Sequence, residues 1–122
     1  MTASRASFPK TDRLRHAEEF RAVLKKAHSV REDGVELYVL ENFAARKNRL
    51  GIVVSRRVFK HAVDRNRIKR TAREFFRLLK AQSLGNFDLV VRILSSDKIL
   101  TSNKLREILT RLFKRAGVLA NG

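Results

Sequence analysis

The stretch that decides the fold runs from Ser55 to Lys80 and reads SRRVFKHAVDRNRIKRTAREFFRLLK. At about 100° per residue, its apolar side chains gather on one side of a helix that we expect from about Ala62 to Ala81. These side chains are Ile68, Ala72, Phe75, Phe76 and Leu79. The spacing therefore predicts a long helix with one face packed against a core.

The other side of this helix is cationic. Between Arg56 and Arg73 the chain has eight lysines or arginines and one acid, Asp64. Counted from Arg65, the residues Arg65, Lys69, Arg73 and Arg77 lie at roughly 0°, 40°, 80° and 120°, and Asn66 and Arg70 fill the same arc at roughly 100° and 140°. Like charges four residues apart cost a few tenths of a kcal/mol per pair in an isolated helix. This face is therefore predicted to bind a polyanion that neutralises it.

The whole chain shares this charge bias. Its 122 residues fit one domain, and the net charge is +16, from 28 basic and 12 acidic residues. Such a charge points first to nucleic acid. An anionic membrane surface is the alternative, but no apolar run approaches the roughly 18 residues of a span. The start of the chain, Met1 to Lys10, lacks a signal peptide's apolar core. Without cysteine there is no disulfide, so we expect a cytoplasmic protein.

Strands are expected on both sides of the basic helix. Leu50 to Ser55 is a short apolar strand, and Val35 to Glu41 alternates between two faces. We expect these two strands to form a hairpin-like antiparallel pair. A further strand follows the helix, from Phe87 to Leu94.

Two more amphipathic helices complete the prediction. One spans about Ala17 to Ala27, and the other follows the cap residues Thr101 to Asn103. We expect a flexible lead-in over residues 1–11 and a flexible tail over 117–122. The order of elements predicts an α/β (α+β) two-layer sandwich, a small sheet with helices packed on it, as a single RNA-binding domain over residues 1–122.

Catalytic motifs are missing from the sequence. It has no glycine-rich phosphate loop, no His-Glu-x-x-His pair and no cysteine nucleophile. The three histidines, His16, His28 and His61, are scattered and are expected on the surface. Nothing brings together the strand acids, Glu36, Glu41 and Asp88, as a metal-dependent nuclease would require. The sequence therefore favours a binding protein with no catalytic or metal-binding side chains. A structural ribosomal protein and a protein-only nuclease are the alternatives.

The segment from Ala62 to Arg73, AVDRNRIKRTAR, resembles the signature helix of the bacterial ribonuclease P protein subunit. The triplet Arg65-Asn66-Arg67 followed by Lys69-Arg70 carries the resemblance. Supporting matches extend it to about residues 12–115: Arg13-Leu14, Glu19-Phe20, Tyr38, Val54-Ser55-Arg56-Arg57 and Phe87 to Val91.

This resemblance implies a subunit of a ribonucleoprotein endonuclease that removes the 5′ leader of precursor tRNA. The catalyst in that family is the large RNA, with Mg²⁺ at its active site, and the protein binds that RNA and the leader. No membrane and no obligate protein partner are implied. The implied fold is of the ribosomal protein S5 domain 2-like type, a mixed sheet with a left-handed strand-helix-strand crossover.

Site residues follow from the resemblance position by position. The set expected to bind the RNA subunit is Arg65, Asn66, Arg67, Lys69, Arg70 and Arg73. The set expected to bind the leader is Phe20, Tyr38, Arg56, Arg57, Lys60 and Arg92. The alternatives are a core role for Phe20 and solvated loop charges for the cations at 56, 57 and 60. The chain departs from the family at Leu24, where a second aromatic is common, at Phe59-Lys60, where glycine is frequent, and at Arg92, which lies two residues before the usual arginine.

Overall fold

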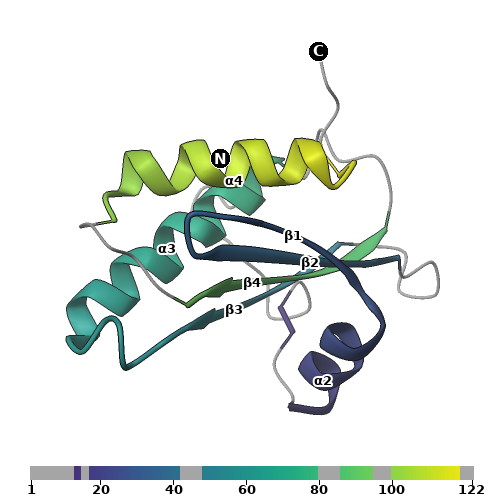
Figure 1. Cartoon of the computed structure of the whole chain (residues 1–122), viewed down its shortest axis with the longest axis horizontal. Helices are drawn as coiled ribbons and strands as arrows, with labels where there is room; N and C mark the ends of the chain where they lie inside the picture. The colour runs from purple at the N-terminus through teal and green to yellow at the C-terminus, as the bar shows by residue number, and fades with distance from the viewer. Residues whose placement is uncertain (1–12, 15–16, 42–47, 80–85, 95–99, 119–122) are drawn as a thin grey trace, which may run out of the picture.

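The computed structural model describes residues 13–14, 17–41, 48–79, 86–94 and 100–118 (Figure 1). The helices are α2 (Ala17–Lys26), α3 (Ala62–Leu79) and α4 (Ser102–Arg115), and the strands are β1 (His28–Glu32), β2 (Val35–Glu41), β3 (Arg49–Val54) and β4 (Phe87–Ile93). The lead-in expected over residues 1–11 lies outside the described residues. The predicted helices at 17–27 and 62–81 are confirmed to within two residues of their described ends.

The strands form one mixed sheet in the order β1-β2-β4-β3. The pairs β1–β2 and β2–β4 are antiparallel, whereas β3 and β4 are parallel and are connected through α3. The predicted hairpin between β2 and β3 is therefore wrong, because β4 lies between them. Apolar alternation shows that each strand has a buried face, but it does not show which strand is the neighbour.

The hairpin partner of β2 is β1, a strand that the sequence analysis did not predict. Its side chains are mostly exposed or half-buried, so it lacks the apolar pattern of a strand. Asp33 and Gly34 connect the two strands with φ angles of 50° and 79°. Two consecutive residues with positive φ match the tight turn that a two-residue hairpin requires.

Helices cover the two faces of the sheet unequally. Figure 1 shows α3 and α4 on one side and α2 on the other. The larger core lies under α3 and α4 and includes Leu37, Ile68, Phe76, Leu109 and Phe113. A smaller cluster under α2 is formed by Leu14, Val23 and Val90, with Phe20, Leu24, Ala27, Tyr38 and Leu40 packed against it. This asymmetry leaves part of the α2 side of the sheet accessible.

Helix α4 has capping contacts at both ends. The Thr101 hydroxyl accepts a hydrogen bond from the Lys104 backbone N–H at 3.1 Å, which confirms the predicted cap. At the other end Gly117 adopts φ 81°, and the N–H of Val118 donates to the Phe113 carbonyl at 3.0 Å. Together with the 3.1 Å bond from Gly117 N–H to the Lys114 carbonyl, this is a Schellman motif. Gly117 and the buried Val118, which were expected in the flexible tail, therefore belong to the helix end.

An ion pair ties α4 to the β1–β2 hairpin. Nε of Arg111 donates to Oε2 of Glu32 at 2.6 Å, and Arg115 Nη1 lies 3.8 Å from Oε1. The hydrogen bond from Arg111 lowers the pKa of the Glu32 carboxyl, with help from the charges of Arg111 and Arg115. Because the folded pKa is lowered, this stabilisation is present above the ordinary pKa and is lost as pH falls through the folded value.

Replacing Glu32 with glutamine should therefore lower the stability of the folded protein at neutral pH but not at acidic pH. We expect the variant to lose less than about 1 kcal/mol at pH 7, because the pair is solvent-screened. Once the pH has fallen below the lowered pKa of Glu32, the variant and the parent should unfold at the same denaturant concentration. Glu41→Gln, on an exposed strand end, is the control with the same charge change. An equal loss at both pH values would contradict the ionic account.

Candidate nucleic-acid interface

The cations of α3 differ in exposure along the helix. Asn66 and Arg70 are exposed, whereas Arg65, Arg67, Lys69 and Arg73 are half-buried. The buried face of the helix contains Ile68, Thr71, Ala72, Phe76 and Leu79, so the predicted division into a packed and a charged face is confirmed. Within the described ranges, Lys69 and Arg70 make no ion pair with an acid of the chain. Their charges are therefore available to an external anion.

Arg65 points back along the chain rather than straight outward. Its Nη1 donates to the backbone carbonyls of Phe59 at 2.8 Å and of Lys60 at 2.9 Å. These bonds join the first turns of α3 to the loop that follows β3. Arg65 therefore shapes this loop, in addition to the predicted RNA contact.

Arg67 lies on a different flank of α3 from Arg65, roughly 200° around the helix axis. Its Nη1 lies 3.4 Å from the Ser102 hydroxyl at the start of α4. The neighbouring Thr71 hydroxyl donates to the Arg67 carbonyl at 2.9 Å and lies 3.1 Å from the same serine oxygen. The predicted set of six thus spans a wide arc, and a ligand that touches all of it must reach both the β3 side and the α4 side.

Arg73 lies at the β3 side of this arc. Desolvation lowers its pKa, and the positive charge of Arg13 lowers it further. Arg13 forms a parallel bridge with Leu50 of β3. The charges of these two arginines are therefore close enough to interact beside the edge strand.

The loop after β3 presents three exposed cations: Arg56, Arg57 and Lys60. The backbone N–H of Arg57 donates to the Ser55 hydroxyl at 3.2 Å, and that of Phe59 donates to the Ser55 carbonyl at 3.0 Å. Phe59 packs against the main core. The aromatic at this position thus anchors the loop from inside while its charged neighbours face solvent.

On the α2 side of the sheet, Phe20 packs over Gly51 of β3. A Cβ atom at Gly51 would lie 2.5 Å from Cε1 of Phe20 and 2.6 Å from Cζ. Glycine is therefore required for the ring to approach the strand this closely. Phe20 and Leu24 both belong to the smaller cluster and are half-buried, so Phe20 has packing contacts as well as an accessible part.

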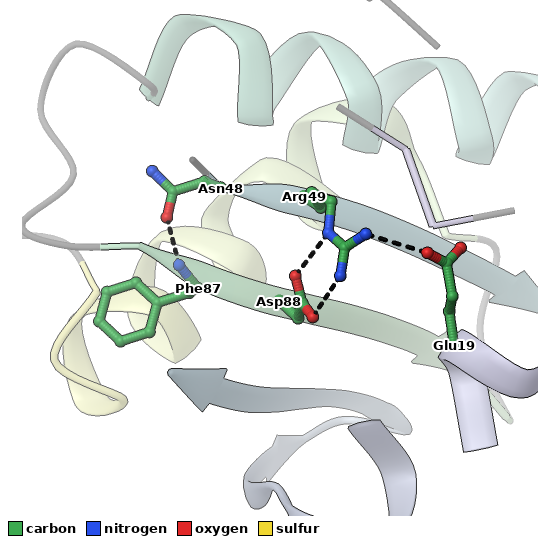
Figure 2. A network of polar contacts seen from close by, with 5 residues as sticks. All are labelled: Glu19, Asn48, Arg49, Phe87 and Asp88. Carbon is green, nitrogen blue, oxygen red and sulfur yellow. Dashed lines mark hydrogen bonds and ion pairs between the residues drawn. The ribbon is translucent and has the colours of Figure 1, made fainter. Parts of the chain in front are cut away.

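A part-buried ion network ties α2 to the sheet (Figure 2). Arg49 of β3 donates to both carboxylate oxygens of Asp88 at 2.8 Å and to Glu19 of α2 at 2.9 Å. The hydrogen bond to Asp88 raises the pKa of Arg49, and the charge of Asp88 adds to this effect. Next to it, the Asn48 side chain accepts from the Phe87 N–H at 2.8 Å. Because Glu19 precedes Phe20, the network also positions that ring.

This network was not predicted from the sequence. The one local signal was Asp88, an acid among the apolar residues of β4, whose other charged residue is Arg92. A buried carboxylate needs a partner, but the chain contains many arginines, and nothing local identifies Arg49 as the partner.

Tyr38 and Arg92 lie together on the α2 side of the sheet. Nη1 of Arg92 donates to the Tyr38 hydroxyl at 3.1 Å, and its guanidinium carbon lies 5.7 Å from the ring centroid. The tyrosine hydroxyl in turn donates to Oε1 of Glu36 at 3.1 Å. The two predicted leader residues are thus joined, and Glu36 is a third member that the sequence analysis did not include.

The predicted leader residues thus fall into two neighbouring groups. Phe20, Tyr38 and Arg92 lie on the α2 side of the sheet, and Arg56, Arg57 and Lys60 lie on the loop that leaves β3. Exposed Val53 connects them, since it pairs with Arg92 and is the penultimate residue of β3. Among the described residues, no three His, Asp or Glu side chains gather as a metal site, and no described helix is long and apolar enough to cross a membrane.

Comparison with known proteins gives concordant matches. A family profile described as Ribonuclease P matches residues 8–117. The chain is 39% identical over 111 residues to the ribonuclease P protein component of Shouchella clausii, covering 91% of this chain and 90% of the relative. It is 32% identical over 114 residues to that of Synechocystis sp., covering 93% and 92%.

Solved structures agree. The RNase P protein of Staphylococcus aureus superposes with a TM-score of 0.82 at 32% identity, over 89% of this chain and 98% of that one. The protein from Thermotoga maritima superposes with a TM-score of 0.70 at 32% identity, over 90% and 98%. The small mixed sheet with its helices is thus a fold shared with these proteins, as predicted.

Proposed function

Because this chain belongs to the ribonuclease P protein family, we propose that it binds the catalytic RNA of ribonuclease P through α3 and holds the 5′ leader of precursor tRNA on its sheet. As a subunit of ribonuclease P it takes part in tRNA processing. The RNA supplies the catalysis, and no side chain of this chain acts on the scissile phosphate. The metal ions of the reaction are Mg²⁺ ions bound by the RNA.

The observation that carries RNA binding is a set of cations without acidic partners. Within the described part of the chain, Arg56, Arg57, Lys60, Lys69 and Arg70 make no ion pair. These five lie on the β3–α3 loop and on the outer face of α3. Such charges repel one another until an anion neutralises them, and RNA phosphates are spaced closely enough to do so. Elsewhere, the acids Asp88, Glu36 and Glu32 pair with Arg49, Arg92 and Arg111 respectively.

The leader lies on the accessible sheet surface beside α2. Tyr38 offers an aromatic side chain for stacking a base, which contributes about 1–3 kcal/mol per base in single-strand binding. Arg56 and Arg57 continue the positive surface beyond β3. A single strand that crosses the sheet toward this loop would approach the first turns of α3. The leader and the RNA subunit would therefore meet near the loop that Arg65 closes.

With this function, we expect the protein to act with its RNA partners in the bacterial cytoplasm. A structural role in the ribosome is not favoured. The charge and the fold class would suit that role equally well, but the family profile that matches this chain is that of ribonuclease P. A protein-only nuclease would need clustered catalytic side chains.

Reconstitution tests the proposal. The purified chain, the ribonuclease P RNA and a precursor tRNA are mixed at low Mg²⁺, and 5′ cleavage is measured with each component omitted in turn. We expect the RNA alone to cleave poorly, the protein alone not at all, and the two together efficiently. Neutralised phosphates reduce the repulsion between substrate and RNA, so the protein should lower the Mg²⁺ requirement.

Two results would contradict the proposal. Cleavage by the protein without the RNA would mean that the chain is itself a nuclease. No stimulation of the RNA by the protein would mean that it does not act as the holoenzyme subunit. A precursor tRNA without its leader separates the two binding roles, since the protein should raise affinity for the leader-bearing substrate more.

A further inference from the structure

One row of side chains crosses the accessible sheet surface next to Tyr38. Arg31 of β1 pairs with Glu36 of β2, Glu36 pairs with Arg92 of β4, and Arg92 pairs with Val53 of β3. Directly paired residues lie on the same face of a sheet. Because Tyr38 is two residues from Glu36, it shares this face. The row therefore places a carboxylate between two arginines, beside an aromatic ring.

The carboxylate of Glu36 has a hydrogen-bond partner but is not fully hydrogen-bonded. Its Oε1 accepts the 3.1 Å bond from Tyr38 and lies 3.7 Å from Arg92, and its Oε2 lies 3.8 Å from Arg31. The ion-pair distances are too long for hydrogen bonds. The Glu36 side chain is 14% exposed, against 32% for Arg92 and 64% for Arg31. An ionised carboxylate offers about four lone-pair sites, so the part-exposed Glu36 carboxylate can accept further hydrogen bonds.

A carboxylate is an unusual group in a surface that binds a polyanion. It repels a phosphate, so a nucleic acid strand cannot place its backbone on Glu36. The two arginines on either side attract phosphates. A strand on this row is therefore oriented with phosphates toward the arginines and a base toward the carboxylate.

We propose that Glu36 is a specificity-determining residue that reads the base-pairing edge of one leader nucleotide. The proposal rests on the leader-binding role proposed above. A carboxylate accepts hydrogen bonds from the amino groups of adenine and cytosine, and from two adjacent N–H groups of guanine. Uracil presents its N–H between two carbonyl oxygens, which the carboxylate repels. Glu36 thus favours guanine, cytosine or adenine over uracil at this position.

A competition experiment tests the proposal at every leader position at once. Precursor tRNA with a randomised leader is bound to the reconstituted holoenzyme with Ca²⁺ in place of Mg²⁺, and the bound and free pools are sequenced. We expect the parent to disfavour uridine by about tenfold at one position. Glu36→Gln, which both donates and accepts, should reduce this preference to within about twofold. Glu41→Gln, on the same strand but the opposite face, should leave it unchanged.

The outcomes separate this proposal from the leader-binding role itself. If the leader adds no affinity relative to leaderless tRNA, the leader site is wrong. If the leader adds affinity but Glu36→Gln keeps the parent's preference, Glu36 does not read the base. If that variant instead tightens the binding of all leaders equally, as the removal of any acid would, the base-reading role is also wrong. Glu36 would then only repel the leader phosphates. Thermal unfolding of each variant confirms that the fold is retained.

Discussion

Replacing Arg49 with methionine should destabilise the domain by about 2–3 kcal/mol, on the order of 10 °C in melting temperature. Methionine keeps most of the volume but leaves the carboxylate of Asp88 without its two bonds of 2.8 Å. The Asp88 side chain is only 7% exposed, so water restores little of the lost interaction. We place the cost below that of a fully buried pair, because Arg49 is 21% exposed. Chemical denaturation measures the loss.

A second substitution distinguishes the loss of the Arg49–Asp88 attraction from the cost of keeping the buried Asp88 carboxylate without Arg49. Arg49→Met combined with Asp88→Leu removes both charges, and apolar replacement of a buried pair is often neutral or stabilising. We therefore expect the double variant to recover much of the stability. Arg21→Met, at an exposed position on α2, is the matched control and should change stability little. A loss below about 0.5 kcal/mol for Arg49→Met would contradict a stabilising role for the network.

The largest effect on RNA binding is expected from Lys69→Ala combined with Arg70→Ala. The parent, if it neutralises about six phosphates, should show a slope near −5 in a plot of log affinity against log salt. Removing two contacts should bring the slope to about −3 and weaken binding on the order of 10- to 100-fold at ~0.1 M salt. Binding of the isolated ribonuclease P RNA at several salt concentrations measures both quantities.

This pair is a cleaner test than Arg65, whose replacement would also release the loop at Phe59 and Lys60. Lys25→Ala with Lys26→Ala is the control, because both lysines are exposed on α2. That variant removes the same charge on the other side of the sheet. Equal weakening by the two double variants would mean that the RNA responds to net charge alone and not to the α3 surface.

The predicted site residues show where local reasoning succeeds. The spacing of apolar and basic residues along α3 identified its packed face and its cationic face, because both depend only on the geometry of one helix. The three loop cations, predicted either to bind the leader or to be solvated loop charges, are exposed, as both interpretations require. Arg65 and Arg67 show the limit of this reasoning. Arg65 donates to a backbone carbonyl in the loop before α3, and Arg67 approaches Ser102 at the start of α4. A helical wheel of α3 contains neither of these partners.

What the sequence determined by itself is therefore the set of main helices, the cationic face of α3 and, through the RNRIKR motif, the family. These properties depend on residues close together along the chain. Only the tertiary structure decided the strand order, the presence of β1, the ion network of Arg49 and the row through Glu36. Each of these joins residues far apart, such as Arg49 with Asp88 and Glu19, which are 39 and 30 positions away. The physical reason is that a strand's alternation determines which side chains face the core, whereas its neighbour is chosen by the packing of the whole sheet.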